Sequence, residues 1–229
     1  MKKRVLLFIV LLVSLGGFGC TPANNNEKAE YEIKAITTDV LYPGLVTCPR
    51  LVGNDDFIEQ VNSLILQSVN SELNEILEDS LPNVILDIGY SVSFQSEELI
   101  CFLFEGTLND ENAAHPSNVA FSISISLTDK KLINISSLFE MNETFVQAFR
   151  AQLNTVADHD RFSENDWEKV SSYIENFSDE EIMNILLKEP EKTLAIQDGG
   201  IIVLFPVPHA IGDYVKIIVP KTGDGLREP

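Results

Sequence analysis

One long amphipathic helix places the strongest constraint on how this chain folds. Apolar side chains recur at the three- and four-residue spacing of a single helix face, and they are Phe57, Val61, Leu64, Ile65, Val69, Leu73 and Ile76. Asn54 is a suitable cap, and the acidic Asp55 and Asp56 suit the positive end of a helix dipole. The sequence therefore predicts a helix from Asn54 to Asp79, whose apolar stripe needs a second apolar surface to cover it.

Strand patterns lie on both sides of this helix in the sequence. They are expected over 31–40, around Val46, and over 84–94, 99–105 and 119–127. The last segment alternates, with Phe, Ile and Leu on one face and Ser122, Ser124 and Ser126 on the other. This alternation predicts an antiparallel strand with one face in water. A turn at 128–131 then leads to a return strand at 132–135.

Helices and then further strands fill the second half of the chain. Helical spacing marks 145–156 and 167–174, and a capping box from Ser178 to Glu181 opens a third helix before Pro190. Strands follow at 193–197, 201–205 and 214–219, and an Asp-Gly turn predicts a hairpin between the first two.

The separation of strand runs from helix runs predicts an α+β fold, an antiparallel sheet with packed helices. We expect a single domain over 31–229, and two subdomains that meet near residue 138 are an open alternative.

The first nineteen residues are typical of an export signal. Lys2, Lys3 and Arg4 precede the apolar run 5–15, which is too short to span a bilayer. Small residues then lead to Cys20 as in the lipobox of bacterial lipoproteins, although Phe18 stands where a small residue is usual. The sequence predicts cleavage after residue 19, a lipid on Cys20 and a flexible tether over 20–30. An ordinary secretory signal followed by a chance cysteine is the alternative.

The lipid on Cys20 would hold the domain at the bacterial cell membrane, or at the outer membrane where the source has one. Thr21 follows Cys20, so the Asp that often retains a lipoprotein at an inner membrane is missing. No second long apolar segment occurs in the sequence, so no other stretch is expected to span a membrane.

Acidic residues dominate the exported part of the chain. Without the three basic residues of the signal, 13 Lys and Arg stand against 35 Asp and Glu, a formal charge of −22. This charge argues against nucleic acid and against anionic lipid as partners, because both would be repelled. It would steer a basic protein toward the chain, although acidity that only keeps an envelope protein soluble is an equal alternative.

The cysteines leave two arrangements open. With Cys20 lipidated, Cys48 and Cys101 remain, and outside the cytoplasm they could form a disulfide. Both lie in strand patterns, so two buried thiols that never meet fit equally well. No CxxC or CxxH spacing occurs near either cysteine, so the sequence predicts no metal site and no cofactor.

No catalytic signature is present. The chain has no GxSxG elbow, HExxH pair, P-loop, GxGxxG loop or EF-hand loop. Its three histidines are His115, His159 and His209. For His115 the alternatives are a binding residue and a turn-stabilising residue, and the run 158–160 is more typical of a solvated loop.

Several short segments, taken in order and spacing, resemble one extracellular family over roughly residues 31–226. They are Tyr42-Pro43, the long helix, Glu105-Gly106, Ala114-His115-Pro116, TDKKLINISSLF over 128–139, Asp198-Gly199-Gly200 and Ala210-Ile211-Gly212. The chain is similar to the extracellular module of the sigma-V anti-sigma factor of Gram-positive bacteria. The same module precedes the catalytic domain of a peptidoglycan N-acetylmuramic acid deacetylase.

This resemblance implies a non-catalytic binding module with one of two ligands, a lysozyme or a cell-wall glycan. It singles out two loops as binding sites, one with His115 and Pro116 and one with His209 and Gly212. Both loops depart from the family pattern: Ala113 and Ala114 replace glycines, and Pro208-His209 stands where aromatic residues are usual.

Two other classes of function stay open. A hydrolase with an unrecognised site would need a pocket in which His115 or His209 meets a carboxylate within hydrogen-bond reach. A passive envelope component would need no sizeable pocket at all.

Overall fold

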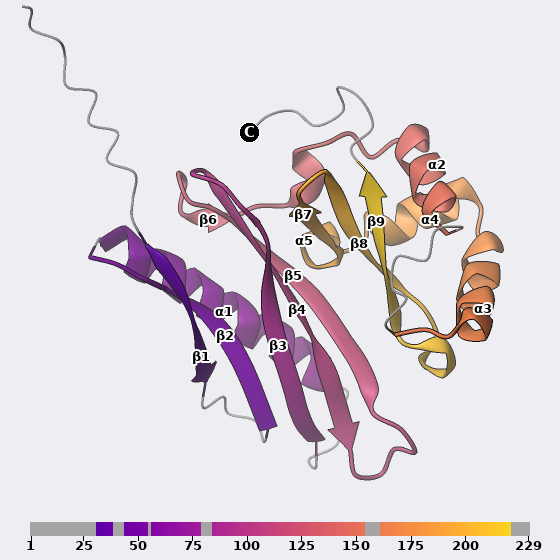
Figure 1. Cartoon of the computed structure of the whole chain (residues 1–229), viewed down its shortest axis with the longest axis horizontal. Helices are drawn as coiled ribbons and strands as arrows, with labels where there is room; N and C mark the ends of the chain where they lie inside the picture. Colours follow the sequence, from indigo (N-terminus) through magenta and orange to yellow (C-terminus); the bar gives the residue numbers. More distant parts are fainter. Residues whose placement is uncertain (1–30, 39–43, 55, 79–83, 154–160, 221–229) are drawn as a thin grey trace, which may run out of the picture.

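A computed structural model describes residues 31–38, 44–54, 56–78, 84–153 and 161–220. It confirms the α+β class, with two sheets and a set of packed helices (Figure 1). The signal, Cys20, the tether and His159 lie outside the described residues. Among the described helices, none is long and apolar enough to cross a membrane.

The larger sheet has six strands in sequence order, β1-β2-β3-β4-β5-β6. Their bounds are β1 Glu32–Thr38, β2 Gly44–Val52, β3 Val84–Gln95, β4 Leu99–Asp110, β5 Ser117–Ser126 and β6 Lys131–Leu132. Neighbouring strands are antiparallel except β2 and β3, which run parallel. Parallel neighbours need a crossover, and the helix α1 (Asp56–Glu78) supplies it. The return strand β6 is shorter than the sequence predicts.

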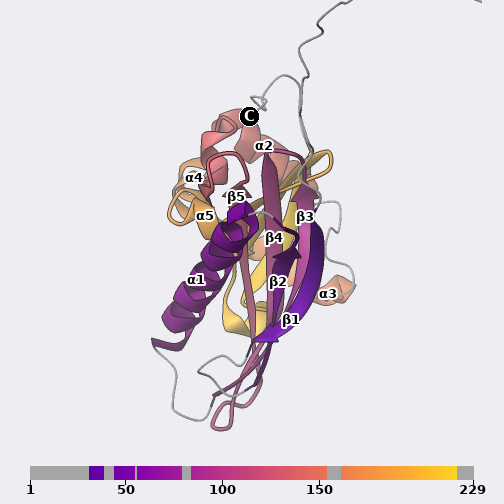
Figure 2. The ribbon, with the colours of Figure 1, turned by 90° about the vertical axis from the view of Figure 1, so that its left-hand side faces the viewer.

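Helix α1 covers one face of this sheet, as the edge-on view shows (Figure 2). Its predicted stripe is confirmed, because Val61, Ile65, Val69 and Leu73 are all buried. These side chains belong to one core with the sheet residues that face the helix, among them Phe102, Phe104, Phe121, Leu86 and Ile88. Phe104 and Phe121 stack across neighbouring strands with ring centroids 4.7 Å apart.

A smaller sheet of three antiparallel strands packs on the other face. Its strands are β7 Leu194–Gln197, β8 Gly200–Pro206 and β9 Tyr214–Pro220. The predicted hairpin is confirmed, since Gln197 pairs with Gly200 and Gly199 turns the chain with φ +82°. The core of the small sheet includes Leu99 and Cys101 of β4. A subdomain boundary near residue 138 stays a prediction.

The prediction that one face of β5 lies in water is wrong. Ser122, Ser124 and Ser126 are 2–5 % exposed, because they lie on the face that meets the small sheet. The Ser122 hydroxyl donates to the Leu194 carbonyl at 2.7 Å, and the Ser124 hydroxyl donates to the Cys101 sulfur at 3.2 Å. Small hydroxyls therefore serve here as buried, hydrogen-bonded contacts between two sheets.

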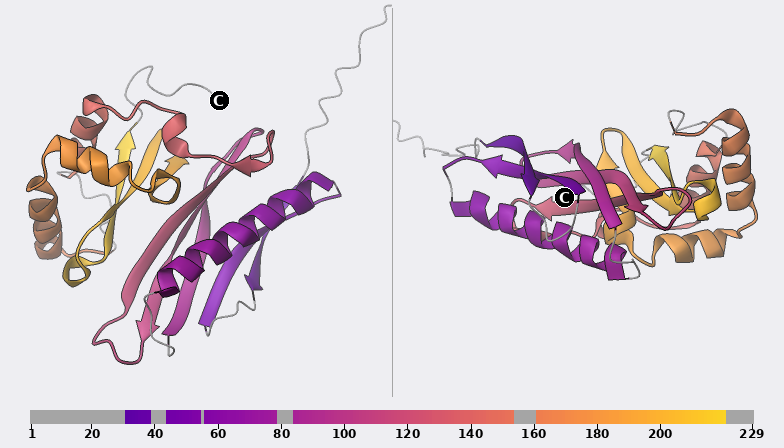
Figure 3. Two further views of the ribbon diagram at one scale, coloured as in Figure 1. Left: turned by 180° about the vertical axis from the view of Figure 1, so that it is seen from behind. Right: turned by 90° about the horizontal axis from the view of Figure 1, so that it is seen from below.

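The helices of the second half lie on the far side of the small sheet, except α5, which lies beside β5 (Figures 1 and 3). They are α2 Glu143–Gln152, α3 Glu164–Glu175, α4 Asp179–Leu186 and α5 Pro190–Thr193. Their inward side chains, which include Phe149, Trp167, Val170, Ile174, Ile182 and Leu186, complete the second core.

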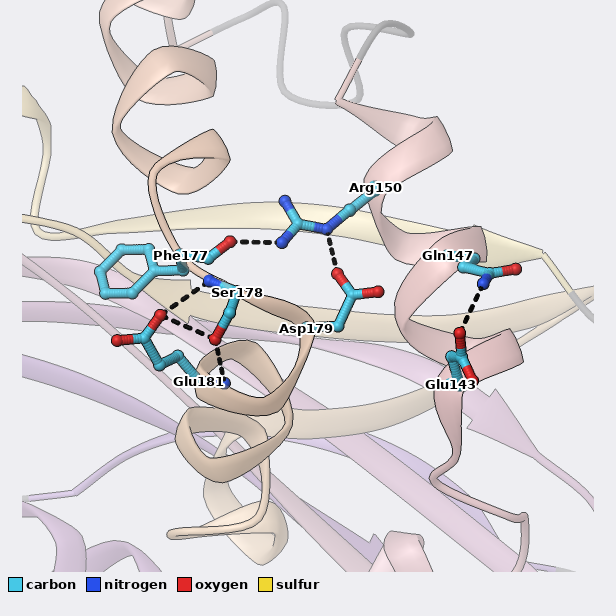
Figure 4. A network of polar contacts seen from close by, with 7 residues as sticks. All are labelled: Glu143, Gln147, Arg150, Phe177, Ser178, Asp179 and Glu181. Carbon is cyan, nitrogen blue, oxygen red and sulfur yellow. Dashed lines mark hydrogen bonds and ion pairs between the residues drawn. The ribbon is translucent and has the colours of Figure 1, made fainter.

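Polar contacts fix α2 against the start of α4 (Figure 4). The Arg150 Nε donates to Asp179 at 2.6 Å, and the same guanidinium donates to the Phe177 carbonyl. Ser178 and Glu181 form the predicted capping box, in which each side chain bonds a backbone N–H of the other residue. The cap and the ion pair together set the direction in which α4 leaves the turn.

The substitution Ser122→Ala tests whether the β5 serines are buried contacts between the two sheets. We expect a loss of about 1–2 kcal/mol in the free energy of unfolding, because the Leu194 carbonyl loses a buried donor. Ser91→Ala, at an exposed position of β3, is the matched control and should change stability by less than about 0.5 kcal/mol. Urea unfolding measures both. Equal effects of the two substitutions would contradict a buried, hydrogen-bonded Ser122.

Candidate functional site

The loops that the resemblance singles out lie at the same end of the molecule. His115 and Pro116 are exposed in the turn that joins β4 and β5. His209 begins the short 3-10 helix η2 (His209–Ile211) between β8 and β9, and Gly212 ends it with φ +114°. No contact between His115 and His209 is recorded within the described residues.

Asn118 and Asp213 tie these two loops together instead. The backbone N–H of Asn118 donates to Asp213 Oδ2 at 2.7 Å, and the Asn118 amide donates to the same oxygen at 3.3 Å. The Asn118 amide also lies 3.4 Å from the Gly212 carbonyl. Asn118, two positions after Pro116, therefore connects the two loops, whereas His115 does not.

His209 meets the hydrogen-bond criterion for a hydrolase only in part. Its Nδ1 lies 2.8 Å from Asp213 Oδ1. Its side chain, however, is 52 % exposed, and the described residues place no hydroxyl or thiol on its ring. A general base needs a proton to take within hydrogen-bond reach. The observed geometry indicates that the hydrogen bond between His209 and Asp213 stabilises the loop.

Gly212 has a structural reason to be glycine. A Cβ at this position would lie 2.8 Å from Phe162 Cε1, and the positive φ would strain any other residue. The Arg161 guanidinium donates to the Gly212 carbonyl at 3.2 Å and stacks on the Tyr214 ring, 4.0 Å from its centroid. Neither Arg161 nor Tyr214 carries a sequence signal, because their contacts join distant segments.

A second polar cluster joins the two sheets next to this loop. The Tyr214 hydroxyl donates to Glu105 Oε1 at 3.1 Å, and the Lys216 ammonium donates to the two Glu105 oxygens at 2.9 and 3.0 Å. Glu105 lies on β4, whereas Tyr214 and Lys216 lie on β9. The Glu105 carboxylate therefore links β4 of the large sheet to β9 of the small sheet.

A groove of about 580 Å³ opens beside this cluster. Its floor is formed by β5 residues Asn118–Phe121. One wall comes from the C-terminal half of α1, and the other comes from α4, α5 and the strands β8 and β9. A volume of this size is within the range of small-ligand sites in proteins.

The charges in the groove are unevenly balanced. Lys192 pairs with Glu72 at 3.2 Å and with Glu75, and Glu189 and Lys188 also line the groove. Burial raises the pKa of Glu72 despite Lys192, and the neighbouring Glu75 and Glu189 add to the rise. Burial alone would lower the pKa of Lys192, but its contacts with Glu75 and Glu72 outweigh that effect and raise it. Two carboxylates therefore share the partly buried Lys192 ammonium, and a third lies close to Glu72.

The two cysteines do not form a disulfide. Neither Cys48 nor Cys101 is part of a disulfide, and both are buried, 1 % and 0 % exposed. Cys48 belongs to the core under α1, and Cys101 belongs to the core on the opposite face of the large sheet. Two side chains on opposite faces of a sheet cannot reach one another. No group of potential metal ligands occurs among the described residues.

Comparisons with known proteins concern the fold. No protein-family model matches the sequence. No curated protein matches it. The structure is similar to the crystal structure of a DUF3298-family member from Bacteroides fragilis, with a TM-score of 0.51 and 13% identity over 84% of this chain and 91% of that chain. A DUF3298-family protein from Pseudomonas aeruginosa PAO1 gives a TM-score of 0.46 at 13% identity, over 83% and 89% of the two chains. At this identity the likeness shows a DUF3298-like fold and nothing about activity.

The substitution Asp213→Ala tests the loop brace. We expect a loss of about 2–3 kcal/mol in the free energy of unfolding, because the Asn118 N–H loses its acceptor and alanine is strained at φ 68°. Asp213→Asn keeps an acceptor and tolerates that φ, so it should cost less than about 1 kcal/mol. His209→Ala should cost less than about 0.5 kcal/mol, since its side chain is half exposed. Thermal and urea unfolding give the ranking, and a His209 effect as large as that of Asp213→Ala would contradict this account.

Thiol labelling tests the cysteine arrangement. The native chain without Cys20 should not react with a thiol reagent, because both thiols are buried and burial raises the pKa of Cys101, only partly offset by the Ser124 hydrogen bond. In guanidinium without reductant, both Cys48 and Cys101 should react. Fewer free thiols in the unfolded, unreduced protein would mean that a disulfide had formed.

Proposed function

We propose that this chain is a lipid-anchored module of the bacterial envelope that binds a basic protein of the lysozyme class without acting on it. The observation that carries the proposal is a row of exposed carboxylates on α3. Glu164, Glu168 and Glu175 are all exposed, and helical geometry puts them within about 40° of one another around the helix axis. The row extends for about 16 Å along the helix.

The surroundings of this row add to its negative potential. The first turn of α4 contributes the exposed Glu180 and Glu181. Lys169 is the nearby cation on α3, and its ammonium is paired with Asp166 at 2.8 Å. We refer to Glu164, Glu168 and Glu175 as the α3 row. A basic protein would be steered to such a surface, and complementary charges would fix its orientation.

The resemblance supplies the ligand class. An anti-sigma factor that senses lysozyme carries the similar module, and many lysozymes are strongly basic. The lipid on Cys20 and the tether after it would present the α3 row outside the membrane. The His209–Asp213 pair is the one feature that favours a hydrolase, and it lacks a bound nucleophile among the described residues.

Binding to a basic lysozyme is the measurement that tests the proposal. The mature chain without its lipid, residues 21–229, is titrated against lysozyme across salt concentrations. We expect binding that persists at about 0.15 M salt, where the Debye length is about 8 Å. The triple substitution Glu164→Lys, Glu168→Lys and Glu175→Lys should weaken binding more than about tenfold, because the attraction becomes a repulsion.

A second triple variant separates the row from net charge. Glu98→Lys, Glu111→Lys and Glu140→Lys change three other exposed carboxylates by the same total charge. This control should keep most of the affinity of the unaltered chain. Equal losses in both variants, or binding that disappears at about 0.15 M salt, would reduce the acidity to a solubility feature. The cell-wall glycan of the resemblance would then be the next ligand to measure.

A further inference from the structure

The groove exposes the free edge of a β-strand. β5 pairs with β4 along its whole length, but β6 pairs with only Ile125 and Ser126 on the other edge. The groove floor, Asn118–Phe121, lies within the part of β5 that β6 does not pair with. An unpaired strand edge is a template for the backbone of another segment.

The direction of the free backbone groups follows from their neighbours. The Ser124 carbonyl accepts from Ile133 on the open edge at 2.8 Å, and the Asn118 N–H donates to Asp213 on the same edge. Backbone groups of alternate residues in a strand point to the same edge. Ala120 lies between these two residues, so its N–H and carbonyl point into the groove. Within the described part of the chain, no partner for them is recorded.

The walls of the groove suit the side chains of an extended peptide. Side chains of a strand alternate between two directions. An added strand would direct one set toward Ile76 of α1 and the other toward Leu204 and Pro206 of β8. Most of the lining is apolar, so alternating apolar side chains would be buried on both sides.

The charge of the α1 wall selects the chemistry of the peptide. Glu72 and Glu75 both pair with the Lys192 ammonium, and Glu189 lies near enough to Glu72 to raise its pKa. The Glu72 side chain is only 16 % exposed. The groove lining holds more carboxylates than ammonium groups, since Lys188 and Lys192 stand against Glu72, Glu75, Glu189 and Asp213. A further cation would relieve the surplus of negative charge in this partly desolvated site. A Lys or Arg side chain that points toward α1 supplies it.

We propose that the groove binds an extended, basic segment of a partner protein, which adds as a strand to β5 at Ala120. Backbone hydrogen bonds to Ala120 would hold the segment, and the carboxylates near Lys192 would select a basic residue. This site is separate from the α3 row and does not depend on a lysozyme ligand.

The proposal is tested with blocked peptides on the mature chain, residues 21–229. The probe is fluorescently labelled Thr-Val-Lys-Val-Thr-Val, and the comparison is the same peptide with Glu in place of Lys. Fluorescence anisotropy should show the Lys peptide binding about tenfold more tightly. No binding of the Lys peptide, or equal binding of the two peptides, overturns the proposal.

Two variants locate the site. Ala120→Pro removes the N–H that points into the groove and leaves the ladder with β4 intact, so it should abolish binding. Glu75→Gln with Glu189→Gln should reduce the preference for Lys over Glu, whereas the matched pair Glu98→Gln and Glu111→Gln should not. Binding to Ala120→Pro at unchanged affinity would exclude strand addition.

Modified peptides keep the test valid even if Ala120→Pro does not fold. Two versions of the Lys peptide are N-methylated at alternate backbone positions. In strand addition one version loses the hydrogen bonds to β5 and the other keeps them, so their affinities should differ by more than about tenfold. Equal affinities of the two versions would overturn the proposal.

Discussion

The structure depends on a single strand that is buried on both faces. Within β4, Ile100, Phe102 and Phe104 point toward α1, and Leu99, Cys101 and Leu103 point toward the small sheet. The two main cores therefore share β4 as a common wall. Because alternate side chains of one strand must satisfy two different apolar surfaces, the continuous apolar run 99–104 fixes which layer lies on which side.

The placement of the polar clusters follows from this shared wall. Beyond Leu103, β4 continues to Glu105, where the apolar contact between the sheets ends and an ion pair with Lys216 takes over. On β5 the same boundary lies between the buried Ser122 and Asn118, which bonds Asp213. The groove opens at this boundary, where the small sheet covers Ala120 only in part.

Negative charge gathers on two different surfaces of the molecule, the α3 row and the groove near Lys192. The α3 row is exposed on one face of its helix, which suits a large basic partner that approaches from solvent. Near Lys192 the Glu72 carboxylate is partly buried beside a strand edge, which suits a single basic side chain on an extended backbone. Salt screens exposed charges that lie more than about a Debye length apart, whereas partly buried charges are screened much less. The two surfaces therefore imply different kinds of recognition.

Much of the architecture could be predicted from local pattern. The helix α1, the capping box at Ser178 and the Asp-Gly hairpin depend on residues within a few positions of each other, so the sequence alone determined them. The α+β class followed from the order of these elements. The serines of β5 show where such reasoning fails: alternation reports polarity, and a hydroxyl is equally compatible with water and with a buried carbonyl from a distant strand. The contacts of Asp213, Arg161 and Glu105 described above could not be predicted for the same reason, because these partners lie 50 or more residues away. Local periodicity determined the elements of this protein, and only the tertiary structure decided which polar side chains are buried, which strand edge stays free and which loops meet, since long-range packing sets all three.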